Sequence, residues 1–386
     1  MRALFASTRG AGHYFPLVPF MEALRRQGHE VLVAGPAELA PVVAADGFEH
    51  WPFGDPPEDE IGAVWERVRR MTVSDDEQRL AVEAVVVGEL FGRLRTTYSL
   101  PRLFEACAQW RPDVVLRDLS QFGSALAAER HGIPHARIGF GISAAEHYNL
   151  ALVADAIQAI RSEHGLDPDP GMERLRGSPY FTCTPASLED PEAPPQPHTV
   201  RFRDPAWDAS AEPLPDWWPG DERPLVYITF GSVAGGEERF RTAYSAAAEA
   251  VADLPVRVLM TIGREMDGDA LRPLPANVHL EPWVRQADVL AQAATVVHHG
   301  GSGSTTGALA AGLPAVVVPM FADQPLNARA VERAGAGLVV EPASAQEIEA
   351  AVAAVLEDDA YAQAARRVAD EMRAHPPTDA VVEHLD

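Results

Sequence analysis

The chain has 386 residues, a length that favours two domains of ordinary size. Its formal net charge of −24 argues against nucleic-acid backbones and anionic membrane surfaces as partners, because both repel an acidic protein. All 32 basic residues are arginine, which excludes chemistry that needs a lysine, such as a Schiff base, a pyridoxal-phosphate anchor or a lysine-bearing phosphate loop.

Two cysteines and one long uncharged stretch indicate where in the cell the protein is expected to work. Cys107 and Cys183 lack the close spacing of metal ligands, so we expect reduced thiols of a cytoplasmic protein. Residues 289–322 contain no Asp, Glu, Lys or Arg, but Gly, Pro, Ser and Thr interrupt them repeatedly. This stretch therefore indicates a buried α/β core rather than a membrane span.

The first half of the chain alternates strand and helix patterns. An apolar strand at Ala3–Ser7 leads through a loop into an amphipathic helix from about Phe15 to Gln27, and a second strand follows at Val31–Gly35. This order predicts a parallel sheet with helices on both faces. The further elements expected here are a strand at Asp113–Leu116, a helix at Gly123–His131, a strand at Pro134–Ile138 and, over the acidic residues 52–80, an exposed loop and helix.

A proline-rich stretch divides the chain. Nine of the 36 residues from Glu189 to Pro224 are proline, a density that stiffens the chain and blocks regular structure. We therefore expect an N-terminal Rossmann-like domain over residues 1–200, a linker over 201–224 and a second Rossmann-like domain over 225–365. Residues 366–386 are expected to form a C-terminal helix and tail that pack back on the first domain.

The second half repeats the α/β pattern. The fold class is thus α/β, with two Rossmann-like domains that face each other across a cleft. The strands expected in this half are Leu225–Phe230, Arg257–Ile262, Val278–Glu281, Thr295–His298, Ala315–Pro319 and Gly337–Val340.

The most informative motif lies at residues 295–324. A strand runs into two histidines and the small residues Gly300–Thr305, which precede a helix. Glycines let a backbone approach a ligand closely, and the free N–H groups of a helix start attract anions. Further along, Asp323 and Gln324 follow another strand and offer both acceptors and donors to vicinal hydroxyls. An anion-binding loop beside residues that can bind vicinal hydroxyls indicates a nucleotide-sugar site.

Two residues of the first half predict acid–base chemistry. His13 follows the first strand in the turn Gly10-Ala11-Gly12, and Asp118 follows the strand Asp113–Leu116. Strand carboxyl ends are where open α/β sheets bind ligands. A histidine there is a candidate general base, and a carboxylate can fix its tautomer and stabilise its charged form. A capping histidine and an unrelated surface aspartate are the structural alternatives.

Several weaker signals accompany these motifs. Gly231 and Ser232 follow a strand and offer N–H and hydroxyl groups to a phosphate, while Trp283 with Gln286 favours a nucleobase site. The pairs Asp167/Asp169 and Asp267/Asp269 resemble metal-binding acids, but an acidic chain produces such pairs by chance. We therefore predict no metal site.

Taken together, the chain resembles GT-B fold glycosyltransferases that use nucleoside-diphosphate sugars, in the subgroup that decorates bacterial antibiotics and other natural products. The motifs GAGH at 10–13, FGS at 230–232, W-V-x-Q at 283–286, HHGGSGST at 298–305 and ADQPLNA at 322–328 occur in the family's order. One departure is Arg285, where many relatives carry proline.

The resemblance implies a hexosyltransferase that inverts the anomeric carbon. The N-terminal domain would bind an aglycone, with His13 as base and Asp118 as its partner, and the C-terminal domain would bind a dTDP- or UDP-sugar without metal or other cofactor. The donor-site residues implied are Gly231, Ser232, Trp283, Val284, Gln286, His299, Gly301, Gly303, Ser304, Thr305, Asp323 and Gln324. The acceptor-site residues expected are Tyr14, Phe140, His147 and Tyr148.

Three alternatives stay open at this point. A sugar-nucleotide 2-epimerase shares the architecture and would need no acceptor. An NAD-dependent dehydrogenase has similar turns, although the first turn lacks a well-formed G-x-G-x-x-G and no acidic residue closes the second strand. An inactive sugar-nucleotide-binding partner is the non-enzymatic alternative. The partners expected are small molecules, and the chain is expected to be a monomer or a homodimer.

Overall fold

The structure, a computed structural model, describes the whole chain except residues 72–75, 195, 209–212, 237–239 and 386. The chain forms two compact units. The first domain comprises residues 1–182, 191–202 and 377–386, and the second domain comprises residues 183–190 and 203–376. Most of the stretch 201–224 thus belongs to the second domain, while its residues 209–212 lie outside the described part.

A seven-stranded sheet forms the centre of the first domain, in the order β3-β2-β1-β4-β5-β6-β7. All neighbouring strands are parallel. The order reverses between β1 and β4, and such a switch point is where doubly wound sheets bind ligands. The strands are β1 (Arg2–Ala6), β2 (Glu30–Pro36), β3 (Glu49–Phe53), β4 (Val114–Asp118), β5 (His135–Gly139), β6 (Tyr180–Thr182) and β7 (Thr199–Arg201).

Three of these strands are absent from the sequence prediction. β3 contains Pro52, which has no N–H to donate to a neighbour. The strand tolerates it because β3 lies at the edge of the sheet. β6 and β7 span only three residues each, too few for a periodic pattern.

Helices cover both faces of this sheet. The helix expected from Phe15 to Gln27 is instead divided into two pieces, η1 and α2, because Pro16 and Pro19 lack the N–H that a continuous helix needs, and the short helix α1 precedes them. The helices are α1 (Ala11–Tyr14), η1 (Phe15–Leu17), α2 (Val18–Arg26), η2 (Ala37–Leu39), α3 (Ala40–Ala45), α4 (Glu58–Arg69), α5 (Asp76–Glu83), η3 (Ala84–Arg95), α6 (Thr96–Trp110), α7 (Phe122–His131), α8 (Ser143–Glu163) and α9 (Glu173–Arg176).

The acidic region at residues 52–80 is more regular than the sequence indicated. Its helix α4 buries Ile61, Val64 and Val68 in a small apolar cluster with η3, which is a π-helix. The helix α5 follows, and residues 72–75 lie outside the described part. The region is therefore largely helical, with a hydrophobic contact of its own.

The second domain has a six-stranded sheet in the order β10-β9-β8-β11-β12-β13. Its strands are again parallel, and its switch point lies between β8 and β11. The strands are β8 (Leu225–Thr229), β9 (Arg257–Thr261), β10 (Val278–Glu281), β11 (Thr295–His298), β12 (Ala315–Val317) and β13 (Gly337–Val339). The chain therefore contains the two doubly wound sheets that the sequence predicted.

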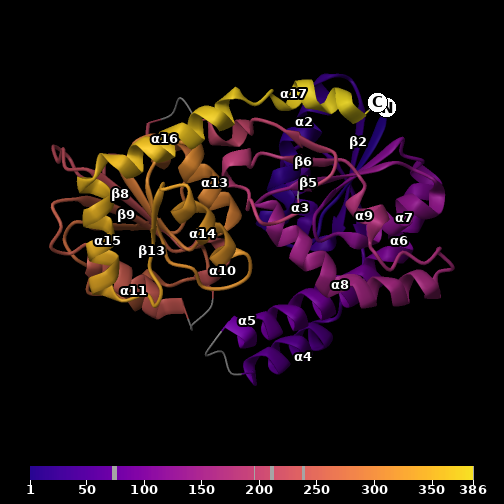
Figure 1. Cartoon of the computed structure of the whole chain (residues 1–386), viewed down its shortest axis with the longest axis horizontal. Helices are drawn as coiled ribbons and strands as arrows, with labels where there is room; N and C mark the ends of the chain where they lie inside the picture. Colours follow the sequence, from indigo (N-terminus) through magenta and orange to yellow (C-terminus); the bar gives the residue numbers. More distant parts are fainter. Residues whose placement is uncertain (72–75, 195, 209–212, 237–239, 386) are drawn as a thin grey trace. The chain divides into compact units, whose positions relative to one another are not determined.

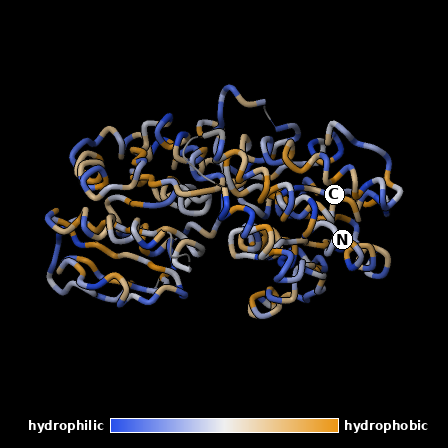
Figure 2. Tube along the Cα trace, turned by 90° about the horizontal axis from the view of Figure 1, so that it is seen from below, coloured by the Kyte–Doolittle hydropathy of each residue, from blue (hydrophilic) through white to orange (hydrophobic). Residues whose placement is uncertain are grey.

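Alternate residues of each strand face opposite layers of helices. Val226 and Ile228 of β8 pack with α11 and α15, whereas Leu225 and Tyr227 face the other side. Figure 1 shows α11 and α15 on one side of this sheet and α13 and α14 on the other, and Figure 2 shows the apolar segments inside each domain. The helices are η4 (Ala186–Leu188), η5 (Pro205–Trp207), α10 (Gly231–Ala234), α11 (Arg241–Ala250), η7 (Gly268–Leu271), α12 (Gln286–Leu290), α13 (Ser302–Ala310), α14 (Gln324–Arg333), α15 (Ala345–Glu357) and α16 (Asp359–Ala374).

The last residues of the chain return to the first domain. They form α17 (Thr378–Val381) and η8 (Val382–Leu385), and α17 lies beside α2 (Figure 1). The guanidinium of Arg26 donates to both carboxylate oxygens of Asp379, at 3.1 and 2.8 Å. Among the described residues, none of the helices combines the length and the apolar character needed to cross a bilayer.

Candidate active site

The first group of candidate residues lies at the switch point of the first sheet. β1 leads into the short helix that carries His13, and β4 ends at Asp118. Because β1 and β4 are parallel neighbours, their carboxyl ends lie at one edge of the sheet. The structure brings the two side chains together, with 3.1 Å between His13 Nδ1 and Asp118 Oδ1.

The carboxylate of Asp118 is fully buried and held by the backbone. Its Oδ2 accepts a hydrogen bond of 2.7 Å from the N–H of Thr8, and its Oδ1 accepts one of 2.7 Å from the N–H of Ser120. A carboxylate only accepts, so the proton of a neutral His13 sits on Nδ1 and leaves Nε2 free to take another. The geometry is that of a general base with an orienting carboxylate.

A buried guanidinium fixes the turn that follows β4. Arg117 Nη1 donates to the carbonyl oxygens of Asp118 and Leu119, both at 3.1 Å. Burial, with the neighbouring cation Arg137, lowers the pKa of Arg117 to about 10, so it stays charged at neutral pH. This buried cation thus stabilises the turn that follows Asp118.

Two phenylalanines flank the imidazole of His13. The Phe140 ring lies 5.5 Å from it, edge-on, and the Phe91 ring lies 5.7 Å away. Phe91 comes from the π-helix η3, and the guanidinium of Arg95 covers its ring at 4.7 Å. Sequence reasoning missed Phe91, because one aromatic residue in an apolar helix is usually core. The His13 side chain keeps 21% of its surface exposed, so the imidazole is accessible.

The other expected acceptor residues differ in their surroundings. Tyr14 is fully buried and its hydroxyl donates to Asp46 at 2.7 Å, so we do not retain it as an acceptor contact. His147 and Tyr148 are partly exposed near the start of α8. Burial raises the pKa of the Tyr148 phenol, with Glu83 adding to the effect.

The second group of candidates lies at the equivalent point of the second sheet. Gly231 follows β8 after one residue, and His299 directly follows β11. Gly231 has a φ of 78°, and a Cβ there would lie 2.7 Å from His299 Nε2. A Cβ at Gly301 would overlap the same ring. The two glycines make room for this imidazole at the start of α13, while Ser232 is exposed on α10.

The two histidines have different tasks. His298 Nδ1 accepts a hydrogen bond of 3.0 Å from the N–H of Gly300 and so shapes the loop. Burial lowers the pKa of His298 to about 3 and that of His299 to about 4. Both rings are therefore neutral at neutral pH, and His299 can meet an anion as an N–H donor.

The start of α13 offers further donors. Gly301 caps the helix without a side-chain hydrogen bond, and the first intrahelical bond runs from the N–H of Thr305. The N–H groups of the three preceding helical residues are thus available to an anion. A Cβ at Gly303 would meet nothing within 4 Å, and Thr305 Oγ1 is buried without a partner among the described residues. Ser304 is also buried.

A polar network ties α14 to this loop. Ser302 Oγ donates to Asp323 Oδ2 at 2.5 Å, and Asn327 Nδ2 donates to the same oxygen at 2.9 Å. Asn327 Nδ2 also lies 2.8 Å from the carbonyl oxygen of Gly300. Sequence reasoning did not select Ser302, although its place in the motif was a usable signal. The network leaves Asp323 Oδ1 without a hydrogen bond from any described residue.

Gln324 is less available than the sequence indicated. It is 2% exposed, and its Oε1 accepts hydrogen bonds from the N–H groups of Met320 (2.8 Å) and Phe321 (3.0 Å). Its oxygen therefore shapes the turn before α14. The adjacent Ala322 has a φ of 56°, a strained conformation of the kind found at binding sites.

The loop before α12 presents an aromatic surface. Trp283 is 59% exposed, and the guanidinium of Arg264 lies 5.4 Å from its ring. Val284 packs against the core beside it. Gln286 Nε2 is buried without a hydrogen-bond partner among the described residues, which leaves a donor for a ligand. Arg285 caps the start of α12.

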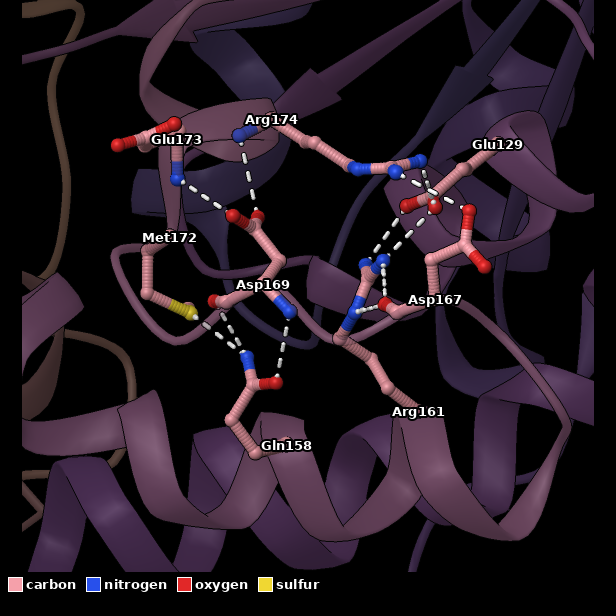
Figure 3. A network of polar contacts seen from close by, with 8 residues as sticks. All are labelled: Glu129, Gln158, Arg161, Asp167, Asp169, Met172, Glu173 and Arg174. Carbon is pink, nitrogen blue, oxygen red and sulfur yellow. Dashed lines mark hydrogen bonds and ion pairs between the residues drawn. The ribbon is translucent and has the colours of Figure 1, made fainter.

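The two acidic pairs have structural partners. Figure 3 shows the carboxylate of Asp169 accepting from the N–H groups of Glu173 (2.9 Å) and Arg174 (3.1 Å) at the start of α9, while the Asp167 carboxylate pairs with Arg174. Asp267 likewise caps η7, and Asp269 pairs with Arg272. Among the described residues, no group of three or more His, Cys, Asp or Glu side chains is placed to hold a metal ion.

Two doubly wound domains, one with a histidine–carboxylate pair and one with free N–H groups at a helix start, have the architecture of a GT-B glycosyltransferase. Comparison with known proteins agrees. Residues 22–173 match the N-terminal domain model, and residues 246–386 the C-terminal domain model, of the family described as erythromycin biosynthesis protein CIII-like.

Individual relatives extend over the whole chain. The elloramycin glycosyltransferase ElmGT of Streptomyces olivaceus is 31% identical, over 98% of this chain and 95% of that protein. The 10-deoxymethynolide desosaminyltransferase of Streptomyces venezuelae is 26% identical, over 100% and 96%. The crystal structure of SsfS6 from Streptomyces sp. SF2575 with thymidine diphosphate has a TM-score of 0.78 and 26% identity, and covers 100% of this chain and 99% of that one. The chain belongs to the erythromycin biosynthesis protein CIII-like family of antibiotic glycosyltransferases.

Proposed function

We propose that the protein transfers a deoxysugar from a dTDP-sugar to a hydroxyl group of a polyketide-type aglycone, with inversion at the anomeric carbon. The observation that carries this proposal is the His13–Asp118 pair at the switch point of the first sheet. A general base is what a hydroxyl nucleophile requires, and a sugar-nucleotide 2-epimerase has no acceptor to deprotonate.

The chemical step follows from the position of the free nitrogen. His13 Nε2 takes the proton of the acceptor hydroxyl while its oxygen forms a bond to C1 of the sugar. The bond from C1 to the diphosphate oxygen breaks on the opposite face, so dTDP leaves and the configuration inverts. Asp118 then balances the charge of the imidazolium.

The second domain supplies groups for the leaving diphosphate. The free N–H groups at the start of α13 and the neutral imidazole of His299 meet the developing charge without a metal ion. Trp283 offers a flat face for the base, and Asp323 Oδ1 is free to accept from a sugar hydroxyl. Separate groups of the second domain thus bind the base, the diphosphate and the sugar of one donor molecule.

Three relatives support the choice of partners. SsfS6, 26% identical, is known in complex with thymidine diphosphate. ElmGT and the desosaminyltransferase are named for elloramycin and for 10-deoxymethynolide. The apolar rings of Phe91 and Phe140 beside His13 fit an acceptor with a large carbon skeleton.

Calorimetric titration with dTDP, UDP and NAD⁺, followed by a transfer assay with dTDP-sugars and a panel of polyketide aglycones, tests the proposal. We expect dTDP binding, and a product whose glycosidic bond is inverted. In the variant His13→Ala, transfer should fall by about 10²–10⁴-fold while dTDP affinity stays unchanged. Binding of NAD⁺ alone, sugar release without acceptor, or full turnover of the variant would each contradict it.

A further inference from the structure

The turn η5 is a hydrogen-bonded part of the second domain, although it lies in the proline-rich stretch. Asp204 caps it by accepting a hydrogen bond of 2.8 Å from the N–H of Ala206. The N–H of Arg203 donates to the carbonyl oxygen of Pro376 at 2.8 Å, beyond the end of α16. The turn is thus anchored by its own cap and by the end of the domain.

At its centre, Trp207 packs against the helix that carries the diphosphate motif. A Cβ at Gly307, in α13, would lie 2.5 Å from Cζ3 of the indole. A glycine inside a helix costs about 1 kcal/mol relative to alanine, so this close approach supplies the reason for it. The indole Nε1 is buried and has no acceptor among the described residues, which points to ring volume as the property that matters.

At its end, the same turn contacts the loop that carries the base-stacking candidate. Arg285 Nη2 donates to the carbonyl oxygen of Asp208 at 2.9 Å, and Nη1 donates to Asp288 Oδ1 at 2.8 Å. Arg285 is the N-cap residue of α12, two residues after Trp283. Arg285 thus ties the turn η5 to the start of α12.

We propose that the turn Pro205–Asp208 positions α12 and α13 relative to each other for nucleotide binding, with Trp207 and Arg285 as positioning residues. The inference rests on the proposed function. A nucleoside diphosphate must reach both elements at once, with its base at the α12 loop and its diphosphate at α13. Small displacements of either group lower the binding energy, so the spacing of the two helices affects a ligand that spans them.

The contact with Gly307 provides a steric test. We expect Gly307→Ala to weaken dTDP binding about tenfold, which corresponds to ~1.4 kcal/mol, because the new methyl group displaces the indole. Trp207→Ala should weaken it to a similar extent, and the double variant should bind no more weakly than either single variant, because both changes remove the same contact. Trp207→Phe keeps most of the ring and should bind like the wild type.

Thymidine separates positioning from general damage. It reaches only the α12 loop, so its affinity should change little in the same variants, while that of dTDP falls. Arg285→Pro and Arg285→Ala should act in the same direction as Trp207→Ala, but more weakly, since Arg285 is partly exposed. The donor KM should rise and the acceptor KM should not.

The outcomes separate the two proposals. A wild-type protein that binds no dTDP would refute the proposed donor, whereas normal dTDP affinity in folded Trp207→Ala and Gly307→Ala proteins would overturn the positioning role. Equal losses for thymidine and dTDP would also overturn it. If Trp207→Ala does not fold, Gly307→Ala and Trp207→Phe decide the matter, with folding checked by thermal unfolding.

Discussion

The side-chain amide of Asn327 donates a hydrogen bond of 2.8 Å to the carbonyl oxygen of Gly300. Through this bond, the helix that follows one strand of the second sheet holds the loop that follows its neighbour. The same amide nitrogen contacts Asp323, which also accepts from Ser302. The diphosphate and sugar parts of the proposed donor site are therefore parts of one network.

Removing this amide tests the network. Asn327→Ala leaves the buried carbonyl of Gly300 unpaired, so the free energy of unfolding should fall by about 1–3 kcal/mol. The affinity for dTDP should fall with it, because the start of α13 loses a support. Ser302→Ala removes only the hydroxyl bond to Asp323 and should have the smaller effect in urea unfolding and calorimetry. Equal effects would contradict the central place of Asn327.

The buried carboxylate gives a second prediction. Asp118→Asn has one acceptor oxygen for two backbone N–H groups, so one of them faces an NH₂ group. We expect destabilisation of about 1–3 kcal/mol, and transfer slowed by about 10²–10⁴-fold because His13 loses its partner. Asp113→Asn, at the other end of the same strand segment, is the control and should turn over normally. Near-normal turnover in Asp118→Asn would remove Asp118 from the mechanism.

A third prediction uses two glycines of the same motif. In Gly301→Ala the new Cβ overlaps the His299 ring, so the melting temperature and the dTDP affinity should both fall. In Gly303→Ala the Cβ enters open space, and alanine favours a helix, so the melting temperature should stay level or rise. If that open space is the diphosphate position, Gly303→Ala should still bind dTDP more weakly. Thermal melts with and without dTDP distinguish these outcomes.

A fourth prediction concerns pH. Burial lowers the pKa of His298 to about 3 and that of His299 to about 4, from an ordinary value of 6.5. Between pH 6.5 and about 4 the unfolded chain therefore takes up protons that the folded chain refuses, and the free energy of unfolding falls as the pH is lowered. In His298→Asn, whose side-chain oxygen can still accept from Gly300, the fall should be less steep. Urea unfolding at pH 7.5 and 5.5 measures this loss of stability. An equal loss in the wild type and in His298→Asn would show that His298 does not cause it.

Much of the fold was predictable because its strands are buried on both faces. The fully buried strand Thr295–His298 was expected with the bounds that the structure shows. The bounds of Val278–Glu281 were also as expected, although this edge strand is only partly buried. β3 was not expected, because Pro52 argues against a strand and only its edge position permits it. Position in the sheet is not contained in the local sequence.

Site residues could be predicted where a motif marks the end of a strand. They could not be predicted where contacts with residues distant in the sequence determine the position of a side chain. His13 and Asp118 could be paired because both follow strands, but the tie between Tyr14 and Asp46 is made by two helices. The sequence indicates that the amide of Gln324 is free, because it does not show that the amide oxygen accepts from the N–H groups of the preceding turn. Phe91 reaches His13 from a π-helix, whose register no helical periodicity indicates.

The first domain is assembled from three separate stretches of chain, the last being residues 377–386. The pairing of Arg26 with Asp379 shows that this tail belongs to the first domain and not to the second domain, which precedes it in sequence. Anyone who exchanges halves between relatives to combine one aglycone preference with another sugar preference must therefore make two junctions. A single crossover near residue 200 would leave the first half with a foreign tail.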